Sequence, residues 1–111
     1  MDYQTHLQLL QQAKEQDLSN PFICHGIIHL FQEQFDLALD ILRDHLKRDG
    51  KGMAAMGSAK ELIAEAYENY LYIDEDCWLA MLKDRRGSRD EVGIQVQRIL
   101  DTYLEAFAAL V

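Results

Sequence analysis

The sequence is poor in residues that interrupt regular structure and in residues that carry redox or metal chemistry. Its 111 residues include one proline, six glycines and two cysteines. So few helix breakers leave room for long, uninterrupted helices. The cysteines, Cys24 and Cys77, lack a metal-binding spacing and lie in apolar helical segments. We therefore expect buried, reduced thiols in a cytoplasmic protein.

Long apolar runs are absent as well. No run approaches the roughly 18 residues that a membrane span needs. The N-terminus, MDYQTHLQLLQQAKEQ, lacks the basic region and apolar core of a signal peptide. Because 49% of the residues are hydrophobic and 27% are charged, the composition is that of a globular protein. We predict one globular domain, residues 1–111, without a membrane association.

Positive charge is scarce: 11 basic residues face 19 acidic ones, for a net charge of −8. Such a surface repels phosphate at long range and predicts no strong binding to nucleic acids. Nine of the 11 basic residues fall in two basic windows, Arg43–Lys60 and Lys83–Arg89. The rest of the chain holds only Lys14 and Arg98 against 16 acidic residues. Any anion-binding surface should therefore come from the two basic windows.

Apolar residues recur every three or four positions, and strand-like alternation does not occur. This pattern predicts an all-α fold with five helices. The first covers about Asp2–Asp17, and the second, longest one covers about Pro21–Asp49. Asn20 is a good N-cap for the second helix, whose proline fits the first helical position. Gly50 should end it.

The later helices are marked by capping signals. Ser58–Glu61 forms a capping box that opens the third helix. The fourth helix covers about Glu75–Arg86, and Gly87 should stop it. A second capping box, Ser88–Glu91, predicts that the fifth helix starts at once. The segment Lys51–Gly57 is then the only real loop, expected to be mobile. A second apolar stripe on the fifth helix suggests burial against a neighbour or a dimer partner and consists of Leu100, Leu104, Phe107 and Val111.

The lengths of the helices predict an up-and-down bundle around the second one, which carries two apolar stripes. The third and fourth helices are each about half as long. Laid end to end, they would form one broken layer in a four-helix bundle of antiparallel layers. The two basic windows would then lie at opposite ends. Folded back as a hairpin, the same helices would bring the windows to one end. The sequence leaves both arrangements open, and we favour the first.

Two clusters of side chains are weak candidates for sites. His25 and His29 lie one helical turn apart and could chelate a metal. No matching Glu-x-x-His pair occurs, so we favour a solvated polar face and predict no metal and no cofactor. Aromatic residues around the break between the third and fourth helices either form a stacking surface or pack the bend, and we favour packing. They are Tyr67, Tyr70, Tyr72 and Trp78.

The second basic window is the stronger candidate. Cations in the last turn of a helix interact favourably with the helix dipole, by a few tenths of a kcal/mol each. This interaction alone could explain why basic residues gather in the second basic window. Guanidinium groups also suit phosphate recognition. We take Arg85, Arg86 and Arg89 as candidate contacts to an anion or a partner.

The neighbouring sequence resembles the nucleotidyltransferase substrate-binding family, a group of small helical bundles within the HEPN proteins. The resemblance runs from about Asn20 to the C-terminus. Its segments are Asn20-Pro21, GIIHLFQEQFDLALDILRDHL from Gly26, SAKELIAEAY from Ser58 and WLAMLKDRR from Trp78. The family signature Trp-Leu-x-Met-Leu-x-Asp-Arg-Asn is matched at Trp78, Met81, Asp84 and Arg85.

The resemblance implies a five-helix up-and-down bundle that forms homodimers and pairs with a separate minimal nucleotidyltransferase. Such pairs are toxin–antitoxin systems or two-component transferases. Active members are metal-independent ribonucleases that use an arginine and, after a short gap, a histidine. In some, the partner nucleotidylates a nearby tyrosine.

This chain departs from the family after Arg85. The family reads Asn-Leu-Thr-Ser-His-Thr-Tyr-Asp-Glu, whereas this sequence reads Arg-Gly-Ser-Arg-Asp-Glu, without the histidine and the tyrosine. Arg89 cannot replace a group that titrates near neutral pH. We therefore expect a non-catalytic protein that binds a nucleotidyltransferase, a nucleotide or both. The alternatives are a degenerate HEPN ribonuclease toxin that recruits a histidine such as His45, and a purely structural or regulatory dimeric bundle.

Overall fold

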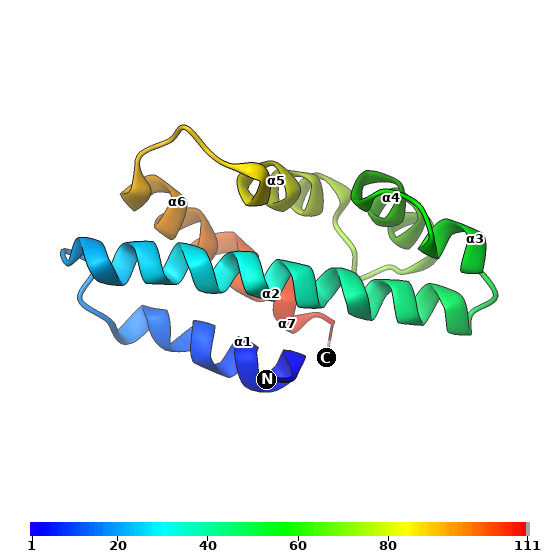
Figure 1. Ribbon diagram of the computed structural model, residues 1–111, viewed down its shortest axis with the longest axis horizontal. Coiled ribbons are helices and arrows are strands. Elements are labelled where there is room, and N and C mark those ends of the chain that lie inside the picture. The colour runs from blue at the N-terminus through cyan, green and yellow to red at the C-terminus, as the bar shows by residue number, and fades with distance from the viewer. Residues whose placement is uncertain (111) are drawn as a thin grey trace.

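A long central helix organises the molecule, as Figure 1 shows. The computed structural model describes residues 1–110, in which every regular element is helical. The all-α fold class is therefore confirmed. Val111, predicted to extend an apolar stripe, lies outside the described residues. None of the helices in residues 1–110 is both long and apolar enough to cross a membrane.

The central helix is α2, Pro21–Arg48. It begins as predicted, because the Asn20 side chain accepts a hydrogen bond from the Phe22 N–H at 2.9 Å. It ends two residues before Gly50, whose φ of +81° lies in the region that glycine adopts most easily. The Lys51 N–H then donates to the Leu46 carbonyl at 2.7 Å and closes the last turn. Both ends of α2 are thus set by neighbours in the sequence.

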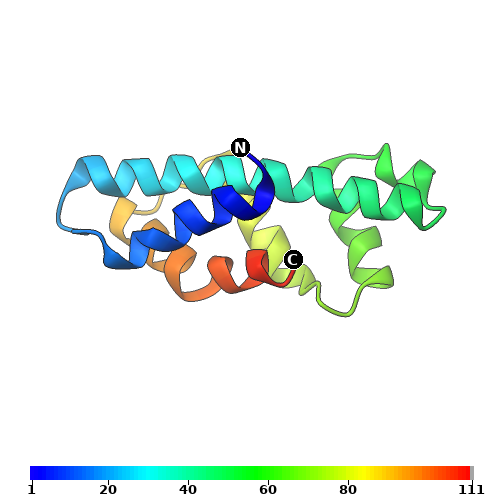
Figure 2. The same ribbon diagram turned by 90° about the horizontal axis from the view of Figure 1, so that it is seen from below.

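The first helix, α1, is Tyr3–Gln11 and runs beside α2 in Figures 1 and 2. It is shorter than predicted, because the chain tightens into a 3₁₀ turn over Gln12–Glu15. Buried polar groups fasten it. The Tyr3 hydroxyl donates to the Phe107 carbonyl at 2.6 Å, and the Gln34 amide donates to the Tyr3 carbonyl at 3.2 Å. His6, which is 3% exposed, contacts Gln34 and Glu33 on α2.

The segment predicted to be the only loop contains a short helix, α3, Gly52–Ala55. Arg43 of α2 holds its end by donating to the carbonyls of Ala55 and Gly57 at 3.0 and 3.3 Å. Helix α4, Ala59–Asn69, follows. The predicted cap at its start is confirmed, since the Ser58 hydroxyl accepts from the Glu61 N–H at 3.2 Å.

Helices α4 and α5 (Glu75–Arg86) pack against each other and against α2. In Figures 1 and 2 they lie across α2 and run in opposite directions, so they do not form the favoured end-to-end layer. The folded-back arrangement has a physical reason at the bend. The Tyr70 hydroxyl donates to Asp49 at 2.6 Å, and the Tyr72 hydroxyl lies 3.4 Å from a ring nitrogen of His45. These contacts hold the bend at the C-terminal end of α2.

The last predicted helix is divided into α6, Val92–Arg98, a π-helical segment over Ile99–Tyr103, and α7, Leu104–Ala108. It does not start directly after α5. Glu91 is the N-cap of α6 and makes no side-chain cap. Ser88 instead accepts from the Asp90 N–H at 3.1 Å, so the second predicted capping box is wrong. This division and α3 give more helical pieces within residues 1–110 than the five expected.

The core is an aromatic cluster where α2, α5 and the C-terminal segment meet. Phe31 stacks on Tyr103 with ring centroids 5.3 Å apart, and Trp78 packs edge-on against Phe107 at 6.0 Å. All four side chains are at most 2% exposed. Both cysteines are free, with Cys24 buried as predicted and Cys77 half-buried. The core thus fixes the first half of α5 against the C-terminal segment.

Candidate functional site

The candidate site lies at the junction between α5 and α6. Helix α5 ends on Lys83, Arg85 and Arg86, whose charges suit the negative pole of the helix. Gly87 then has φ +122° and ψ +118°, a backbone conformation that residues with a Cβ rarely adopt. The chain therefore leaves the helix sharply and crosses to α6 as an extended loop, Gly87–Glu91. We call this segment the junction loop.

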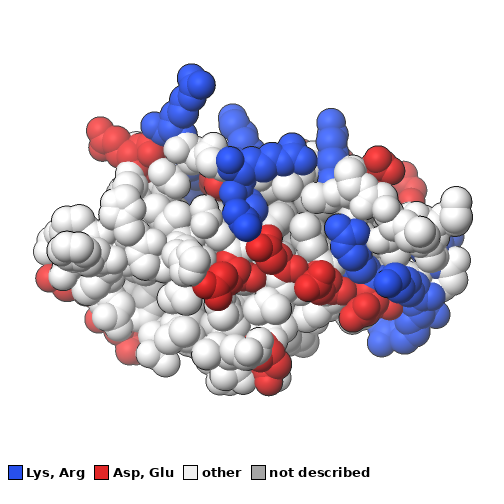
Figure 3. All heavy atoms as spheres, in the orientation of Figure 1, with Lys and Arg blue, Asp and Glu red and all other residues white. Residues whose placement is uncertain are grey.

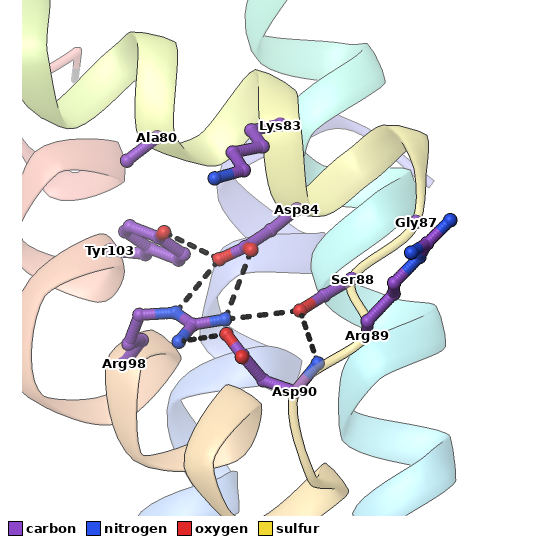
Figure 4. Close-up of a pocket in the computed structure, with 9 residues that line it drawn as sticks. All are labelled: Ala80, Lys83, Asp84, Gly87, Ser88, Arg89, Asp90, Arg98 and Tyr103. Carbon is purple, nitrogen blue, oxygen red and sulfur yellow. Dashed lines mark hydrogen bonds and ion pairs between the residues drawn. The ribbon is translucent and has the colours of Figure 1, made fainter.

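A hydrogen-bond network centred on Asp84 ties the junction loop to the C-terminal segment, as Figure 4 shows. Arg98 donates to both oxygens of Asp84, from Nε and from Nη2, at 3.0 Å each. The Tyr103 hydroxyl donates to Asp84 Oδ2 at 2.6 Å. Arg98 also reaches the loop, donating from Nη1 to Asp90 at 2.8 Å. One arginine thus bridges two carboxylates from different segments.

The network perturbs the proton affinities of its members. Burial raises the pKa of the Tyr103 phenol, and the neighbouring Asp84 carboxylate raises it further. Partial burial opposes the charge of Arg98, but its hydrogen bonds to Asp84 and Asp90 outweigh this and raise its pKa. Tyr103 therefore stays neutral, and Arg98 stays charged, at any physiological pH.

A pocket of about 460 Å³ opens beside this network. Figure 4 shows Lys83 extending over it from α5, whereas Arg89 points away from Arg98 on the outer side of the loop. The pocket wall consists of Ala80, Lys83, Asp84, Gly87, Ser88, Arg89, Asp90, Arg98 and Tyr103. The wall carries three cations and two carboxylates. Arg98 compensates part of the negative charge of Asp84 and Asp90. The junction can therefore accept an anion.

The three arginines predicted as contacts are not brought together. Arg85 is engaged with α2, donating from Nε and Nη2 to the two oxygens of Asp36 at 3.0 Å each, and this hydrogen bonding raises its pKa. Arg86 is exposed, and within residues 1–110 its side chain makes no ion pair. Arg89 is exposed and is the one of the three that lines the pocket.

Charge on the surface is arranged in bands, as Figure 3 shows. Basic side chains gather over α5 and at the end of the molecule where α2 ends. A row of acidic side chains lies along α2 between them. Exposed carboxylates recur there at helical spacing, at Glu33, Asp36, Asp40 and Asp44. We call these four residues the acidic row. The two basic windows therefore flank the acidic row and do not merge.

The aromatic residues of the predicted cluster have separate roles. Trp78 lies in the core with no exposed surface. Tyr70 stacks on Tyr72, with ring centroids 5.5 Å apart, at the bend between α4 and α5. Tyr67 is 52% exposed. Packing, the favoured interpretation, thus describes Trp78 and Tyr70 but not Tyr67.

The histidines lie away from the junction. His25 and His29 are exposed, and His29 pairs with Glu33 one turn further along α2. Within residues 1–110, no group of three His, Cys, Asp or Glu side chains could hold a metal ion. His45 contacts Tyr70 and Tyr72, and no histidine lines the junction pocket.

Sequence reasoning missed the three residues that build the site: Asp84 as its centre, with Arg98 and Tyr103 as its partners. Arg98 did carry a signal, since it is one of only two basic residues outside the windows. Tyr103 occupies an apolar position in the helical period of the last predicted helix, so the sequence pattern gives no sign of the role of its hydroxyl.

Comparison with known proteins adds the family. The family model described as nucleotidyltransferase substrate binding protein like matches residues 1–111. The chain belongs to this family. The match covers the whole chain, including α1, which lies before the segments that carried the resemblance. No curated protein and no solved structure shows significant similarity to the chain.

Proposed function

We propose that this family member is a non-catalytic binding protein that engages a nucleotidyltransferase subunit, its nucleotide substrate or both through the junction of α5 and α6. The observation that carries the proposal is the Asp84–Arg98–Asp90 network. It compensates the local carboxylates and so leaves Lys83, Arg86 and Arg89 available to an external anion. The family supports a binding role, because its model is named for substrate binding.

The three candidate arginines differ in whether their guanidinium groups are already paired within the protein. Arg86 and Arg89 are the main candidates, because both are exposed and neither is paired within residues 1–110. Arg85 donates from Nε and Nη2 to Asp36, so only its Nη1 group is left to contact a ligand. It therefore positions the end of α5 and contributes less to binding.

The test is copurification with a nucleotidyltransferase encoded beside this chain, together with calorimetric titration of ATP. We expect Arg86→Ala/Arg89→Ala to weaken binding about three- to tenfold, since each variant removes one charged contact at an exposed site. Lys14→Ala/Lys51→Ala is the control, because it removes the same charge away from the junction. Unchanged binding of both ligands by the arginine variant would refute the site assignment.

The ribonuclease alternative makes a different prediction. It requires a proton-transfer group near neutral pKa, and the titratable groups that line the pocket are Lys, Asp, Arg and Tyr side chains. Incubating the purified protein with RNA separates the two proposals. Cleavage that is lost in Arg85→Ala would favour the enzyme. The purely structural alternative expects no polar cleft near Arg85, whereas the residues that follow Arg85 and Arg86 line one.

We further infer that the protein is a homodimer. An apolar groove of about 440 Å³ runs between α1 and α2, and Leu9, Ile23 and Leu30 lie in its wall. Covering it with a second copy would remove apolar surface from water. Light scattering should show a dimer for the natural chain and a monomer for Leu9→Asp, with unchanged circular dichroism. A natural chain that is monomeric at high concentration would contradict this.

A further inference from the structure

A second pocket, at the opposite end of α5, has a chemistry of its own. Its volume is about 350 Å³, and it lies between the start of α5 and the C-terminal segment. Its polar and aromatic wall consists of Tyr72, Asp74, Cys77, Trp78, Thr102 and Glu105. Helix α5 has 12 residues and is therefore about 18 Å long, and the two pockets share no wall residue among residues 1–110. We call it the Trp78 pocket.

One wall residue carries an unused hydrogen-bond donor. The Trp78 side chain has no exposed surface, and its indole N–H has no partner. Within residues 1–110 it is the one buried side-chain polar atom left without a partner. Such an orphan is destabilising, so native proteins rarely keep one without a reason. A ligand oxygen in the adjoining pocket would supply the missing acceptor.

The charged groups of the pocket select the sign of the ligand. Within residues 1–110, Asp74 and Glu105 are the charged residues of its wall, and both are carboxylates. Asp74 uses Oδ1 to cap α5, accepting from the Cys77 N–H at 3.2 Å. The Glu105 side chain makes no hydrogen bond or ion pair within residues 1–110. The wall therefore repels anions, and its carboxylates can serve as the counter-charge of a bound cation.

The pKa of the Cys77 thiol reflects the negative charge of the same pocket wall. Burial and, to a lesser extent, the negative charge of Asp74 raise the pKa of Cys77 to about 11. Cys77 is thus neutral at physiological pH and adds no negative charge to the wall. Tyr72 also lines the pocket, and its ring suits an organic cation because aromatic rings attract ammonium groups.

We propose that the Trp78 pocket binds a small organic ammonium compound that carries a neighbouring hydroxyl or carbonyl oxygen. The ammonium group lies between Glu105 and Asp74, and the oxygen accepts from the indole N–H of Trp78. The volume is at the lower end of the range for ligand sites, which limits the ligand to a small molecule. A zwitterion with a carboxylate is disfavoured, because no cation lines the wall.

The π-helical segment links this pocket to the junction. Its residue Thr102 lines the Trp78 pocket, and the next residue, Tyr103, donates to Asp84 in the junction network. Interruptions of this kind occur often at functional sites. The proposal does not depend on the function proposed for the junction, because its ligand and its residues are different.

The chain offers an unusually direct readout, because Trp78 is its only tryptophan. One indole N–H resonance in a ¹⁵N-correlation spectrum therefore reports on the proposed contact. Choline is the probe, and its neutral isostere 3,3-dimethyl-1-butanol is the matched ligand control. We expect choline to shift the indole resonance saturably and the neutral isostere to leave it unmoved.

Variants test the carboxylates. Glu105→Gln should weaken choline binding about three- to fivefold, the contribution of one partly exposed ion pair. Asp74→Asn should weaken it as well while keeping the start of α5, because asparagine is also a good N-cap. Glu15→Gln, which removes an exposed carboxylate from the turn after α1, is the control and should bind as the natural chain does.

Three results would overturn the proposal. The first is an indole resonance that does not move at tens of millimolar choline. The second is an equal shift with the neutral isostere, and the third is unchanged affinity in both carboxylate variants whose remaining spectrum is native. A crystal soaked in choline that holds only a water at the indole N–H would refute it independently.

Discussion

Asp84 has the most demanding environment of any charged residue in the site. It is 12% exposed, and it accepts two hydrogen bonds from Arg98 and one from Tyr103. A carboxylate with this many donors belongs to the structure rather than to a free binding surface. The family signature at Asp84 is therefore explained by folding, and the exposed arginines that follow it are left for binding.

Removing this carboxylate should be costly. We expect Asp84→Ala to lower the free energy of unfolding by about 2–4 kcal/mol, because it leaves Arg98 partly buried without its main partner. Urea denaturation measures the change. Asp101→Ala is the control: this exposed carboxylate accepts only from Gln97 one turn away, and its loss should cost about 0.5 kcal/mol or less. Equal losses in the two variants would contradict the role of Asp84.

The buried tyrosines predict how the fold responds to alkali. Burial raises the pKa of Tyr3 and of Tyr103 above the value of about 10 that each has in the unfolded chain. Above pH 10 the unfolded chain therefore binds fewer protons than the folded one. The free energy of unfolding should be unaffected below about pH 10 and should fall as the pH rises beyond it.

Phenolate absorbance tests this behaviour. Of the five tyrosines, Tyr3 and Tyr103 should ionise only as the protein unfolds. Tyr103→Phe should remove one of these late-ionising phenols and leave the Arg98–Asp84 pair in place. Ionisation of all five near pH 10, with native circular dichroism, would show that the burial argument is wrong.

At the scale of elements, two serines with the same predicted role turn out to differ. Ser58 caps α4 through the Glu61 N–H, whereas Ser88 bonds within the junction loop and α6 begins four residues later. The difference arises at Gly87, whose backbone directs the chain away from a helical turn. A capping box favours such a start but does not force one.

This difference can be measured. Ser58→Ala should lower the free energy of unfolding by about 1 kcal/mol, the usual cost of losing an N-cap. Ser88→Ala should cost clearly less, because no helix start depends on it. Chemical denaturation of both variants provides the comparison, and a loss from Ser88→Ala as large as that from Ser58→Ala would restore the original capping prediction.

At the scale of the whole molecule, the acidic row separates two basic windows that would otherwise make one surface. With a net charge of −8 and a Debye length of about 8 Å at physiological salt, neither window attracts a polyanion from a distance. We therefore expect the chain to lack general affinity for nucleic acids, although it carries two clusters of cations.

Reversing part of the acidic row should create that affinity. We expect Asp40→Lys/Asp44→Lys to elute from heparin at higher salt than the natural chain, because the substitution joins the windows. Glu15→Lys/Asp101→Lys changes the net charge by the same amount at other sites and is the control. If both variants elute together, total charge decides the behaviour and the arrangement of the windows does not.

The sequence by itself determined which residues form helices and where most of them begin and end. Asn20, Ser58 and Gly50 act on backbone groups within a few residues, so their effects can be predicted locally. The apolar period likewise gives the buried faces, and the signature around Trp78 gives the family that the whole-chain match confirms. These features depend on short-range geometry, which the order of residues specifies directly.

Only the tertiary structure decided which charges are paired. Arg85 meets Asp36 from 49 positions away, and Arg98 meets Asp84 across the junction loop. Many such pairings are compatible with one periodic pattern, because each is worth little energy compared with burial of the core. The orientation of α4 and α5, the two pockets and the orphan donor of Trp78 follow from packing all helices together, and no local signal encodes them.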